Sequence, residues 1–223
     1  GESAPTFRLW RNRRAAVIGE NQSARIELHL DICREFGVEV VRRFTGGGAV
    51  YHDLGNLNYS VCVPRASQPG LDFQRKVFRR ATECVVTCLK MLDLDPVSVP
   101  VNTVMIHGRK ISGAGGAIRW GAIFYHGSIL VGTDLEMVWK VLRREQASAE
   151  TRSVQSTRVD VTSVKKELGA DMSIDHIKMA LSKAFEETFD ARLTSMPATK
   201  QERHAISGLV KEKYGADEWN LKM

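Results

Sequence analysis

The stretch RRFTGGGAVYHDLGNLNYS, residues 42–60, decides how the rest of the sequence is interpreted. Three consecutive glycines, Gly46–Gly48, stand between two arginines and a His-Asp pair. Glycine loses more conformational freedom on folding than any other residue, and it is favoured where the backbone takes a positive φ or where a ligand approaches the main chain closely. Backbone N–H groups of such a turn can form a nest for anionic oxygens. The stretch therefore predicts a wall for an anionic ligand, with a plain hairpin loop as the alternative.

This glycine stretch differs from the common phosphate-binding loops. No Gly-Lys-Ser/Thr follows it, as a Walker loop requires. Tyr51 stands where a dinucleotide fingerprint has its third glycine. What remains is a glycine wall with polar flanking residues, which are Arg42, Arg43, His52, Asn56 and Asn58.

Two later segments also place polar residues in glycine-rich surroundings. GRKISGAGGAIR, residues 108–119, puts Lys110 between a turn and an apolar Ile. YHGS, residues 125–128, puts His126 and Ser128 two positions apart, which is the same face of a strand. Each pattern alone is typical of a surface lysine or of a satisfied polar strand residue. Three such clusters in one chain favour a functional site.

Composition bounds the class of protein. The 223 residues are 43% hydrophobic and 26% charged, with a net charge of +6, which suits one large domain or two small ones with a proper core. The sequence has no apolar run long enough for a membrane span, no signal peptide and no Lys/Arg block, so we expect neither a membrane nor a nucleic-acid partner. The four cysteines include no C-x-x-C pair, and reduced, mostly buried thiols in a cytoplasmic protein are expected.

Hydrophobic periodicity predicts an α+β fold with mixed, largely antiparallel sheets flanked by helices, and no linker divides the chain. Strands are expected at residues 7–10 and 15–19, joined as a hairpin by the turn RNRR, and at 38–44, 56–63 and 122–132. Residues 102–113 are expected to form two strands around a turn at His107-Gly108. Helices are expected at 27–36, 72–92, 134–142, 174–189 and 200–213. The polar segment 143–159 is expected to be a mobile loop.

These motifs resemble those of the lipoate-protein ligase family. Residues 42–60 match the family signature at nearly every position, and GRKISG (108–113) is similar to its lysine motif. Weaker similarities follow in the same order, at HGSILV (126–131), STRVDVTSV (156–164) and KYGADEWN (213–220). The resemblance covers about residues 5–220. It implies the catalytic-domain fold that this family shares with biotin-protein ligases, as one domain over residues 1–223.

The resemblance also implies an activity. Enzymes of this family activate lipoate with ATP to lipoyl-adenylate and then transfer the lipoyl group to a lysine of an acidic carrier domain. The implied ligands are ATP, Mg²⁺ and lipoate. The implied carriers are the acyltransferase subunits of 2-oxoacid dehydrogenases and the glycine-cleavage H protein. A separate small accessory subunit is also expected, because this chain stops just past Trp219-Asn220, whereas single-chain bacterial ligases carry a further C-terminal domain.

Lys110 matches the lysine of the family and is expected to contact the α-phosphate and the lipoyl carbonyl. The apolar tunnel for the lipoyl tail is expected to involve Ile18, Phe44 and Val50. The other residues expected to bind ATP or lipoyl-adenylate are Arg43, Gly46, Gly47, Gly48, Ala49, Val50, His52, Asn56, Asn58, Asn102, Ser112, Gly113, Ala114, Ala117, His126 and Ser128.

Two features modify this expectation. The family usually has Asn-Asp before the lysine hairpin, but this sequence has Asn102-Thr103, so the metal ligands are unknown. The basic surface is expected to steer an acidic carrier. The arginines in or beside the polar loop that are expected to contribute are Arg143, Arg144, Arg152 and Arg158.

Three alternatives stay open. An octanoyl- or lipoyl-transferase on the same fold needs a nucleophilic cysteine, which its relatives carry shortly before the Gly-Arg-Lys turn, and residues 93–107 contain none. A biotin ligase would carry a Gly-Arg-Gly-Arg motif, which is absent from the sequence. A non-enzymatic lipoate or lipoyl-adenylate binding protein has no need of Lys110.

Overall fold

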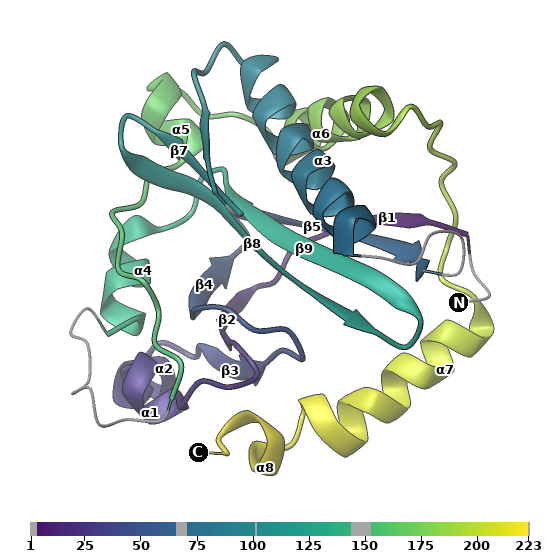
Figure 1. The fold of residues 1–223 in the computed structure, drawn as a ribbon. Helices are drawn as coiled ribbons and strands as arrows, with labels where there is room; N and C mark the ends of the chain where they lie inside the picture. The colour runs from purple at the N-terminus through teal and green to yellow at the C-terminus, as the bar shows by residue number, and fades with distance from the viewer. Residues whose placement is uncertain (1–3, 66–70, 101, 144–152, 223) are drawn as a thin grey trace. The chain divides into compact units, whose positions relative to one another are not determined.

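Two β-sheets organise the chain in the computed structural model, which describes residues 4–65, 71–100, 102–143 and 153–222 (Figure 1). One sheet has six strands in the order β1-β5-β9-β8-β7-β6, and the other has three in the order β3-β2-β4. The contacts divide the chain into two units. Unit 1 consists of Gly1–Asn12, Leu54–Leu135 and Val159–Leu193, and unit 2 consists of Arg13–Asp53, Glu136–Arg158 and Thr194–Met223.

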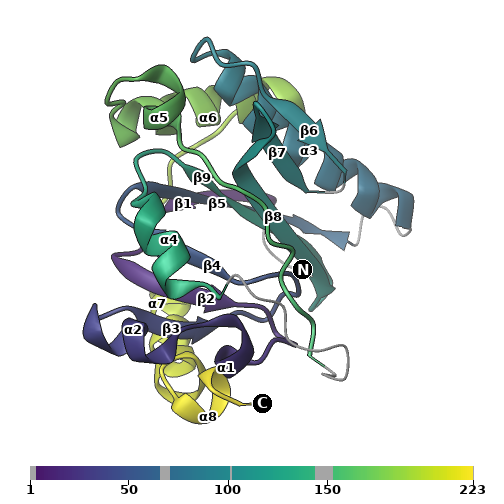
Figure 2. The same ribbon diagram turned by 90° about the vertical axis from the view of Figure 1, so that its left-hand side faces the viewer.

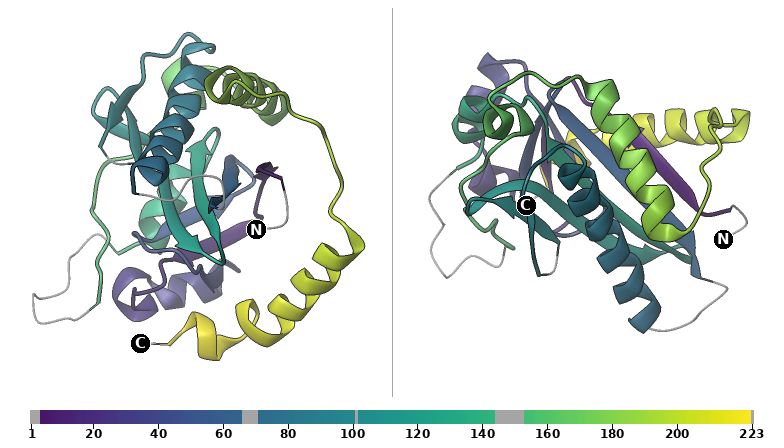
Figure 3. Two further views of the ribbon diagram at one scale, coloured as in Figure 1. Left: turned by 45° about the vertical axis from the view of Figure 1, so that its right-hand side comes forward. Right: turned by 90° about the horizontal axis from the view of Figure 1, so that it is seen from above.

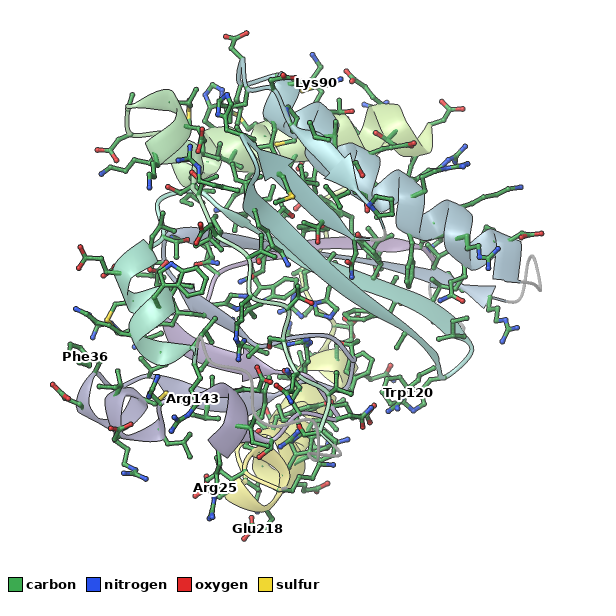
Figure 4. All side chains as sticks on the ribbon, turned by 60° about the vertical axis from the view of Figure 1, so that its left-hand side comes forward. Arg25, Phe36, Lys90, Trp120, Arg143 and Glu218 are labelled. Carbon is green, nitrogen blue, oxygen red and sulfur yellow. The ribbon has the colours of Figure 1, made fainter. Side chains whose placement is uncertain are left out.

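Unit 1 contains the six-stranded sheet, in which all neighbouring strands are antiparallel. Its strands are β1 (Thr6–Trp10), β5 (Asn56–Pro64), β6 (Val97–Val99), β7 (Thr103–Ile106), β8 (Arg109–Arg119) and β9 (Ala122–Leu130). Its helices are α3 (Leu71–Lys90), α5 (Val164–Leu168) and α6 (Ile174–Phe189). Helices α3 and α6 lie side by side over one face of the sheet, as the right panel of Figure 3 shows. Trp120, which is 72% exposed, marks the tip of the β8–β9 hairpin (Figure 4).

The core of unit 1 lies between this sheet and its two long helices. On β5, Leu57, Tyr59 and Val61 belong to the buried apolar cluster together with Val85 of α3 and Leu181 of α6. Successive side chains of a strand point to opposite faces, so the polar residues that alternate with these point away from the helices. Those residues are Asn56, Asn58 and Ser60. One face of the sheet is therefore apolar core, and the other is lined with polar side chains.

Unit 2 is built around the three-stranded sheet. Its central strand β2 (Arg14–Ile18) is parallel to β3 (Glu39–Arg42) and antiparallel to β4 (Val50–Asp53). The helices are α1 (Ala24–Glu27), α2 (Leu30–Glu35), α4 (Leu135–Val141), α7 (Lys200–Leu209) and α8 (Asp217–Asn220), with the π-helical turn η2 (Val210–Tyr214) between the last two. Helices α2 and α8 both contact β3 (Figure 2).

Most of the predicted elements are confirmed. The fold is α+β, and the predicted strands 56–63 and 122–132 and the two strands within 102–113 are present. The turn between the last two has positive φ at both His107 and Gly108, which is typical of a two-residue hairpin. The predicted helices 72–92, 134–142 and 174–189 are present within two residues at each end, and Ser173 caps α6 by accepting from the His176 N–H. No helix in the described segments is long and apolar enough to cross a membrane.

The predicted hairpin of residues 7–10 and 15–19 is wrong. Strand β1 pairs with β5, whereas β2 pairs with β3 and β4. Side-chain alternation identifies a strand but not its partner. The predicted helix 27–36 is also wrong in its continuity, because Leu28 leaves the helical path to form a bridge with Leu142, and α1 and α2 lie on either side.

Other differences concern short or irregular segments. Elements β4, β6, α5 and α8 lie outside the predicted set, and the predicted helix 200–213 changes from α to π geometry at Val210. Within the predicted loop 143–159, residues 144–152 lie outside the described residues, and 153–159 contain no helix or strand. The four cysteines are free thiols; Cys33, Cys84 and Cys88 are buried and Cys62 is half-buried.

Arg42 at the end of β3 is fully buried and joins two distant segments of unit 2. Its guanidinium donates to six main-chain carbonyls, which are those of Gly19, Glu20, Gln22, Trp219, Asn220 and Lys222. In return, the Arg42 N–H donates to Asn220 Oδ1 (2.8 Å) and its carbonyl accepts from Trp219 Nε1 (2.8 Å). Arg42 is thus a structural residue that binds residues 219–222 to the loop after β2.

The variant Arg42→Ala should lower the free energy of unfolding by about 3–5 kcal/mol, because six carbonyls would lose a buried charged donor. Urea unfolding followed by circular dichroism measures this loss. Arg14→Ala is the matched control, since the Arg14 guanidinium donates to the Phe36 carbonyl in an exposed hydrogen bond, and a loss below about 1 kcal/mol is expected for it. Equal losses in the two variants would contradict the role given to Arg42.

Candidate functional site

Lys110, the second residue of β8, lies at an irregularity of the six-stranded sheet. Met105 of β7 is opposite Lys110, but Val104 is opposite Ser112, so Ile111 is the extra residue of a β-bulge. The main chain of Lys110 also pairs with a segment beyond the sheet. Its N–H donates to the Asp160 carbonyl (2.8 Å), and its carbonyl accepts from the Thr162 N–H (2.9 Å).

The bulge changes which side chains share a face of β8. Ile111 and Ser112 are both buried, Ile111 in the apolar cluster and Ser112 with its hydroxyl hydrogen-bonded to the Tyr59 phenol. Lys110 lies beside Gly113 instead, since a Cβ added to Gly113 would be 2.5 Å from Lys110 Cε and 2.6 Å from Nζ. Gly113 therefore provides the space that the end of the Lys110 side chain occupies.

The strand register places several other predicted residues on the same face as Gly113. Gly113 is opposite Ser128 of β9, and Ser128 is in turn opposite Asn58 of β5. His126 lies two residues from Ser128 and faces the same way. Thr103 of β7, at the position where the family usually has Asp, is opposite Gly113 and so shares its face. The polar face of unit 1 thus brings together Lys110, Asn58, Ser128 and His126, as well as Asn56 and Ala117.

Two predicted residues lie elsewhere. Ser112 turns to the core, as described, and Ala114 packs against the buried apolar cluster. Asn102 fixes Ala114 through the main chain: Asn102 Nδ2 donates to the Ala114 carbonyl (2.5 Å), and the Ala114 N–H donates to the Asn102 carbonyl (2.9 Å). The structure therefore separates the side chains of Ser112 and Ala114 from the polar face.

Asn58 is the most unusual polar residue of that face. It is 1% exposed, and neither its Oδ1 nor its Nδ2 has a hydrogen-bond partner within the described residues. Asn56 differs, because its Oδ1 accepts from the Thr133 hydroxyl (2.9 Å). Buried amides are normally satisfied, so Asn58 holds a donor and an acceptor available to a ligand.

In unit 2, Arg43 shapes the glycine stretch. Its guanidinium donates to the carbonyls of Gly46 and Gly48, both at 2.8 Å, and to the carbonyl of Val17 at 3.1 Å. Gly47 has a φ of 95°, which side chains other than hydrogen disfavour. Burial lowers the pKa of Arg43 to about 10, and the side chain keeps its charge at neutral pH. Arg43 thus has a structural role in shaping the glycine wall, in addition to the ligand contact that is predicted for it.

Ser156 holds the other end of the glycine stretch. Its hydroxyl accepts from the Ala49 N–H (2.7 Å) and from Gln22 Nε2 (3.0 Å), and it donates to the carboxylate of Glu27. A Cβ added to Gly48 would lie 2.9 Å from Ser156 Oγ, so only glycine fits there. The Ser-x-Arg similarity at 156–158 pointed to this segment, whereas no sequence signal singled out Gln22 or Glu27.

Arg158 is wrongly assigned to the surface that steers a carrier. Its side chain is 16% exposed, and Nη2 lies 3.1 Å from Oε2 of the fully buried Glu27, which compensates its charge. Arg143 is half-buried and donates to the Leu28 carbonyl (3.1 Å). Arg144 and Arg152 lie outside the described residues. The structure therefore leaves Arg158 no role in steering.

His52 of β4 is buried beside Arg43. Burial, and after it the positive charge of Arg43, lowers the pKa of His52 to about 4. The imidazole is therefore neutral at pH 7, with one nitrogen as a donor and the other as an acceptor. Of the residues predicted to line the lipoyl tail, Ile18 is fully buried and Phe44 and Val50 are half-buried.

The thiols and acidic groups limit the chemistry of the chain. Burial raises the pKa of all four cysteines, to about 12 for Cys84 and Cys88. The thiolate is the nucleophilic form, so none of the four has the environment of an activated thiol. In the segments that the structure describes, no three His, Cys, Asp or Glu side chains gather into a metal site.

The chain is similar to known lipoate-protein ligases. The profile of the Lipoyl protein ligase A/B catalytic domain matches residues 1–186. Lipoate-protein ligase A subunit 1 of Thermoplasma acidophilum is 38% identical over 227 residues, which cover 97% of this chain and 84% of that protein. Lipoate-protein ligase LplJ of Bacillus subtilis is 30% identical over 94% of this chain, which spans only 62% of LplJ. Octanoyltransferase LipM of Symbiobacterium thermophilum is 29% identical, with 88% of its length covered.

Solved structures agree with these relatives. The bi-partite lipoate protein ligase of T. acidophilum, described with its E2 lipoyl domain, is 35% identical with a TM-score of 0.84, covering 99% of this chain and 85% of that one. A T. acidophilum ligase with bound lipoic acid and a lipoate-protein ligase A bound with ATP are each 36% identical with a TM-score of 0.82, covering 99% of this chain and 87% of theirs.

The depressed pKa of His52 predicts a pH-dependent contribution to stability. The unfolded chain binds this proton below about pH 6.5, whereas the folded chain does so only near pH 4. The contribution is therefore complete above pH 6.5 and decreases as the pH falls towards 4, by about 3 kcal/mol in all. Urea unfolding between pH 7 and pH 4 should show the wild type losing this much relative to His52→Gln. Parallel pH profiles of the two proteins would contradict the prediction, as would an NMR titration of His52 near pH 6.5.

Proposed function

Because the chain belongs to the Lipoyl protein ligase A/B catalytic domain family, we propose that it is a lipoate-protein ligase that uses ATP to attach lipoate to a lysine of a carrier protein. The observation that carries this proposal is the position of Lys110, whose Nζ lies beside Gly113 on the polar face of the sheet. The relatives that bind lipoic acid and ATP, at 36% identity, support it.

The first step joins two anions and therefore needs fixed positive charge. A carboxylate oxygen of lipoate attacks the α-phosphorus of ATP, the bond to the β-phosphate oxygen breaks, and pyrophosphate leaves. Negative charge builds on the α-phosphate oxygens during this exchange, and a preorganised ammonium group is an effective stabiliser of such charge. We assign this role to Lys110. The bulge fixes its main chain before any ligand arrives, so little reorganisation is needed at the moment of reaction.

In the second step the carrier lysine attacks the lipoyl carbonyl. The bond between that carbonyl carbon and the phosphate oxygen breaks, and AMP leaves. Charge develops first on the carbonyl oxygen and then on the departing phosphate, and Lys110 is the group we assign to both. The lysine that is modified belongs to the carrier, and its proton passes to solvent or to the leaving AMP.

Ligand-binding residues are assigned in each unit separately. In unit 2 the main-chain N–H groups of Gly46–Gly48 and the neutral imidazole of His52 suit phosphate and carboxylate oxygens. In unit 1 the unsatisfied amide of Asn58 suits a ligand group that both donates and accepts. These assignments follow the family resemblance, and the geometry described above supports them.

The metal is proposed to arrive with ATP. The described residues offer no acidic cluster, and Thr103 presents a hydroxyl where the family usually has a carboxylate. Mg²⁺ is usually held by substrate phosphates and water together with one or two protein groups. We therefore treat MgATP as the substrate and assign no resident metal.

The partners follow from the same relatives. The T. acidophilum ligase is bi-partite and is described with an E2 lipoyl domain. We propose that this chain likewise works with a small accessory subunit and modifies lipoyl domains of 2-oxoacid dehydrogenase acyltransferases, with the glycine-cleavage H protein as a further carrier. The four free cysteines support a reducing, cytoplasmic location.

The octanoyltransferase alternative is disfavoured by the thiols. Such an enzyme carries the acyl group on an activated cysteine, and every cysteine here has a raised pKa, with Cys84 and Cys88 on the buried face of α3. LipM, an octanoyltransferase, is 29% identical to this chain, so overall sequence similarity does not separate the two activities. The distinction rests on the chemistry of the cysteine side chains. The third alternative, a protein that binds lipoate without reacting it, predicts that no lipoylated carrier forms in the activity assay.

The Lys110→Ala variant should lose ligase activity by at least about 1,000-fold, since one preorganised electrostatic contact in a transition state contributes 10²–10³ and Lys110 serves both steps. The assay is the intact mass of an apo lipoyl domain incubated with lipoate, MgATP and the purified chain. Lys165→Ala removes an exposed lysine of the same unit and should keep wild-type activity. Repeating the assay with lipoyl-adenylate tests transfer alone. If the wild-type chain fails with both substrates and with the accessory subunit added, the proposed function is wrong.

Gly113→Ala should lower turnover by about 10- to 100-fold with a stability change below about 1 kcal/mol. The added methyl would displace the flexible end of Lys110 rather than strain the backbone, and misplacement of a reacting group by about 1 Å can cost 10² in rate. Gly132→Ala is the control, because a Cβ there meets nothing within 4 Å. Unchanged turnover in Gly113→Ala would show that Lys110 need not occupy this position.

A further inference from the structure

A nearly buried carboxylate lies next to the Lys110 hairpin. Glu167, in helix α5, has a side chain that is 4% exposed, and it collects three donors. Arg109 Nη2 donates to its Oε1 (2.8 Å), His107 Nδ1 lies 3.0 Å from its Oε2, and the Thr162 hydroxyl also donates to Oε1. Two of these donors come just before Lys110 in the chain: His107 lies in the β7–β8 turn, and Arg109 is the first residue of β8.

The third donor connects Glu167 to the main chain of Lys110 from the opposite side. Thr162 is fully buried, and its N–H donates to the Lys110 carbonyl while its hydroxyl binds Glu167. Glu167 thus joins the residue before Lys110 to the segment that pairs with Lys110 at the bulge. Among the described residues, the main chain of this segment is bonded to β8 by the two hydrogen bonds of Lys110 alone. Glu167 adds a side-chain link between the same two segments.

Helix α5, which carries Glu167, is held in place by contacts with the core of unit 1. Val164 is fully buried in the core of unit 1, and the Lys165 N–H donates to the Val131 carbonyl at the end of β9 (2.8 Å). Ser163 caps the helix by accepting from the Lys166 N–H, and Gly169 ends it with a φ of 66°. Burial by itself would raise the pKa of Glu167, but the hydrogen bonds from Thr162 and His107 and the charge of Arg109 together outweigh it and lower the pKa. The carboxylate is therefore ionised at neutral pH.

We propose that Glu167 is the positioning residue of Lys110: by holding Arg109, His107 and Thr162 together, it fixes the bulge that directs Lys110 to the polar face. This inference rests on the proposed function for its kinetic consequence, though not for its structural one. Glu167 touches no reacting atom in this scheme and acts only through the main chain of Lys110. Its loss should lower the rate of reaction and leave substrate affinity unchanged.

The test is the isosteric variant Glu167→Gln, which removes the charge and sets an amide N–H₂ against donors. We expect kcat for lipoyl transfer from lipoyl-adenylate to fall by about 10- to 100-fold, as for other small misplacements of a reacting group, with KM within about 2-fold. Hydrogen exchange gives a readout that does not depend on activity. Exchange of the Lys110 and Thr162 amides should accelerate at least about 10-fold, while that of the β5–β9 amides should not change.

Glu186→Gln is the matched control, because the carboxylate of Glu186, in α6 of the same unit, also accepts a hydrogen bond, in this case from the Leu193 N–H (2.7 Å). Its kcat and the exchange of the Lys110 amide should equal those of the wild type. Thr162→Val provides a second test if Glu167→Gln does not fold, since it removes the hydroxyl bound to Glu167 and keeps the N–H bound to Lys110. It should show the same pattern with a smaller effect.

The outcomes separate the two hypotheses. Faster exchange at Lys110 and Thr162 together with a lower kcat and an unchanged KM supports the proposal. Unchanged exchange overturns it whether or not the chain is active, and so does faster exchange with unchanged kcat, which would make Glu167 purely structural. A wild-type chain that is inactive with both lipoyl-adenylate and lipoate plus MgATP, with the accessory subunit added, overturns the proposed function instead, and leaves the exchange measurement to decide the role of Glu167.

Discussion

The alternation of side chains across the six-stranded sheet is the constraint on which unit 1 depends. Successive side chains of a strand point to opposite faces of the sheet. Helices α3 and α6 pack against one of those faces and form the core with it. The polar residues of β5 and β9 are left on the opposite face by this division alone. A chain that must bury Leu57, Tyr59 and Val61 therefore presents Asn56, Asn58 and Ser60 together, so the same pattern that stabilises the unit also assembles its polar surface.

Among the described strand pairs of unit 1, this alternation is broken by the bulge at Ile111. Strict alternation along β8 would put Lys110 on the same face as Ser112, which the family resemblance also places at the ligand site. The extra residue sends Ser112 to Tyr59 in the core and leaves Lys110 with Gly113. The fold class, the long helices and the faces of β5 and β9 could be predicted because they follow from local periodicity. A bulge could not, since it is set by the pairing of Lys110 with residues 160–162, some fifty positions away.

The interior of unit 2 contains buried charged and polar side chains, which hydrophobic periodicity does not predict. Arg42 is surrounded by carbonyls, and Glu27 is fully buried with Ser156 and Arg158 as partners. The family motif drew attention to Arg43 and the glycines, which are visible as a local pattern. Glu27 and Gln22 look like ordinary residues of a short helix and its approach, because their importance comes from partners more than a hundred residues away. The wrong hairpin of β1 and β2 has the same origin, in that neighbours in sequence are not neighbours in the sheets.

The contacts of Arg42 also constrain the order in which the protein can form. Arg42 and Asn220 are 178 residues apart, and contacts at such separations are slow to form because a long loop must close first. During synthesis, β3 leaves the ribosome long before residues 219–222 have been added to the chain. The Arg42 guanidinium must therefore stay hydrated until those residues are made. Unit 2 is therefore completed only after Lys222 has been translated. Unit 1 ends at Leu193, so all of its residues are synthesised before the last partners of Arg42 exist.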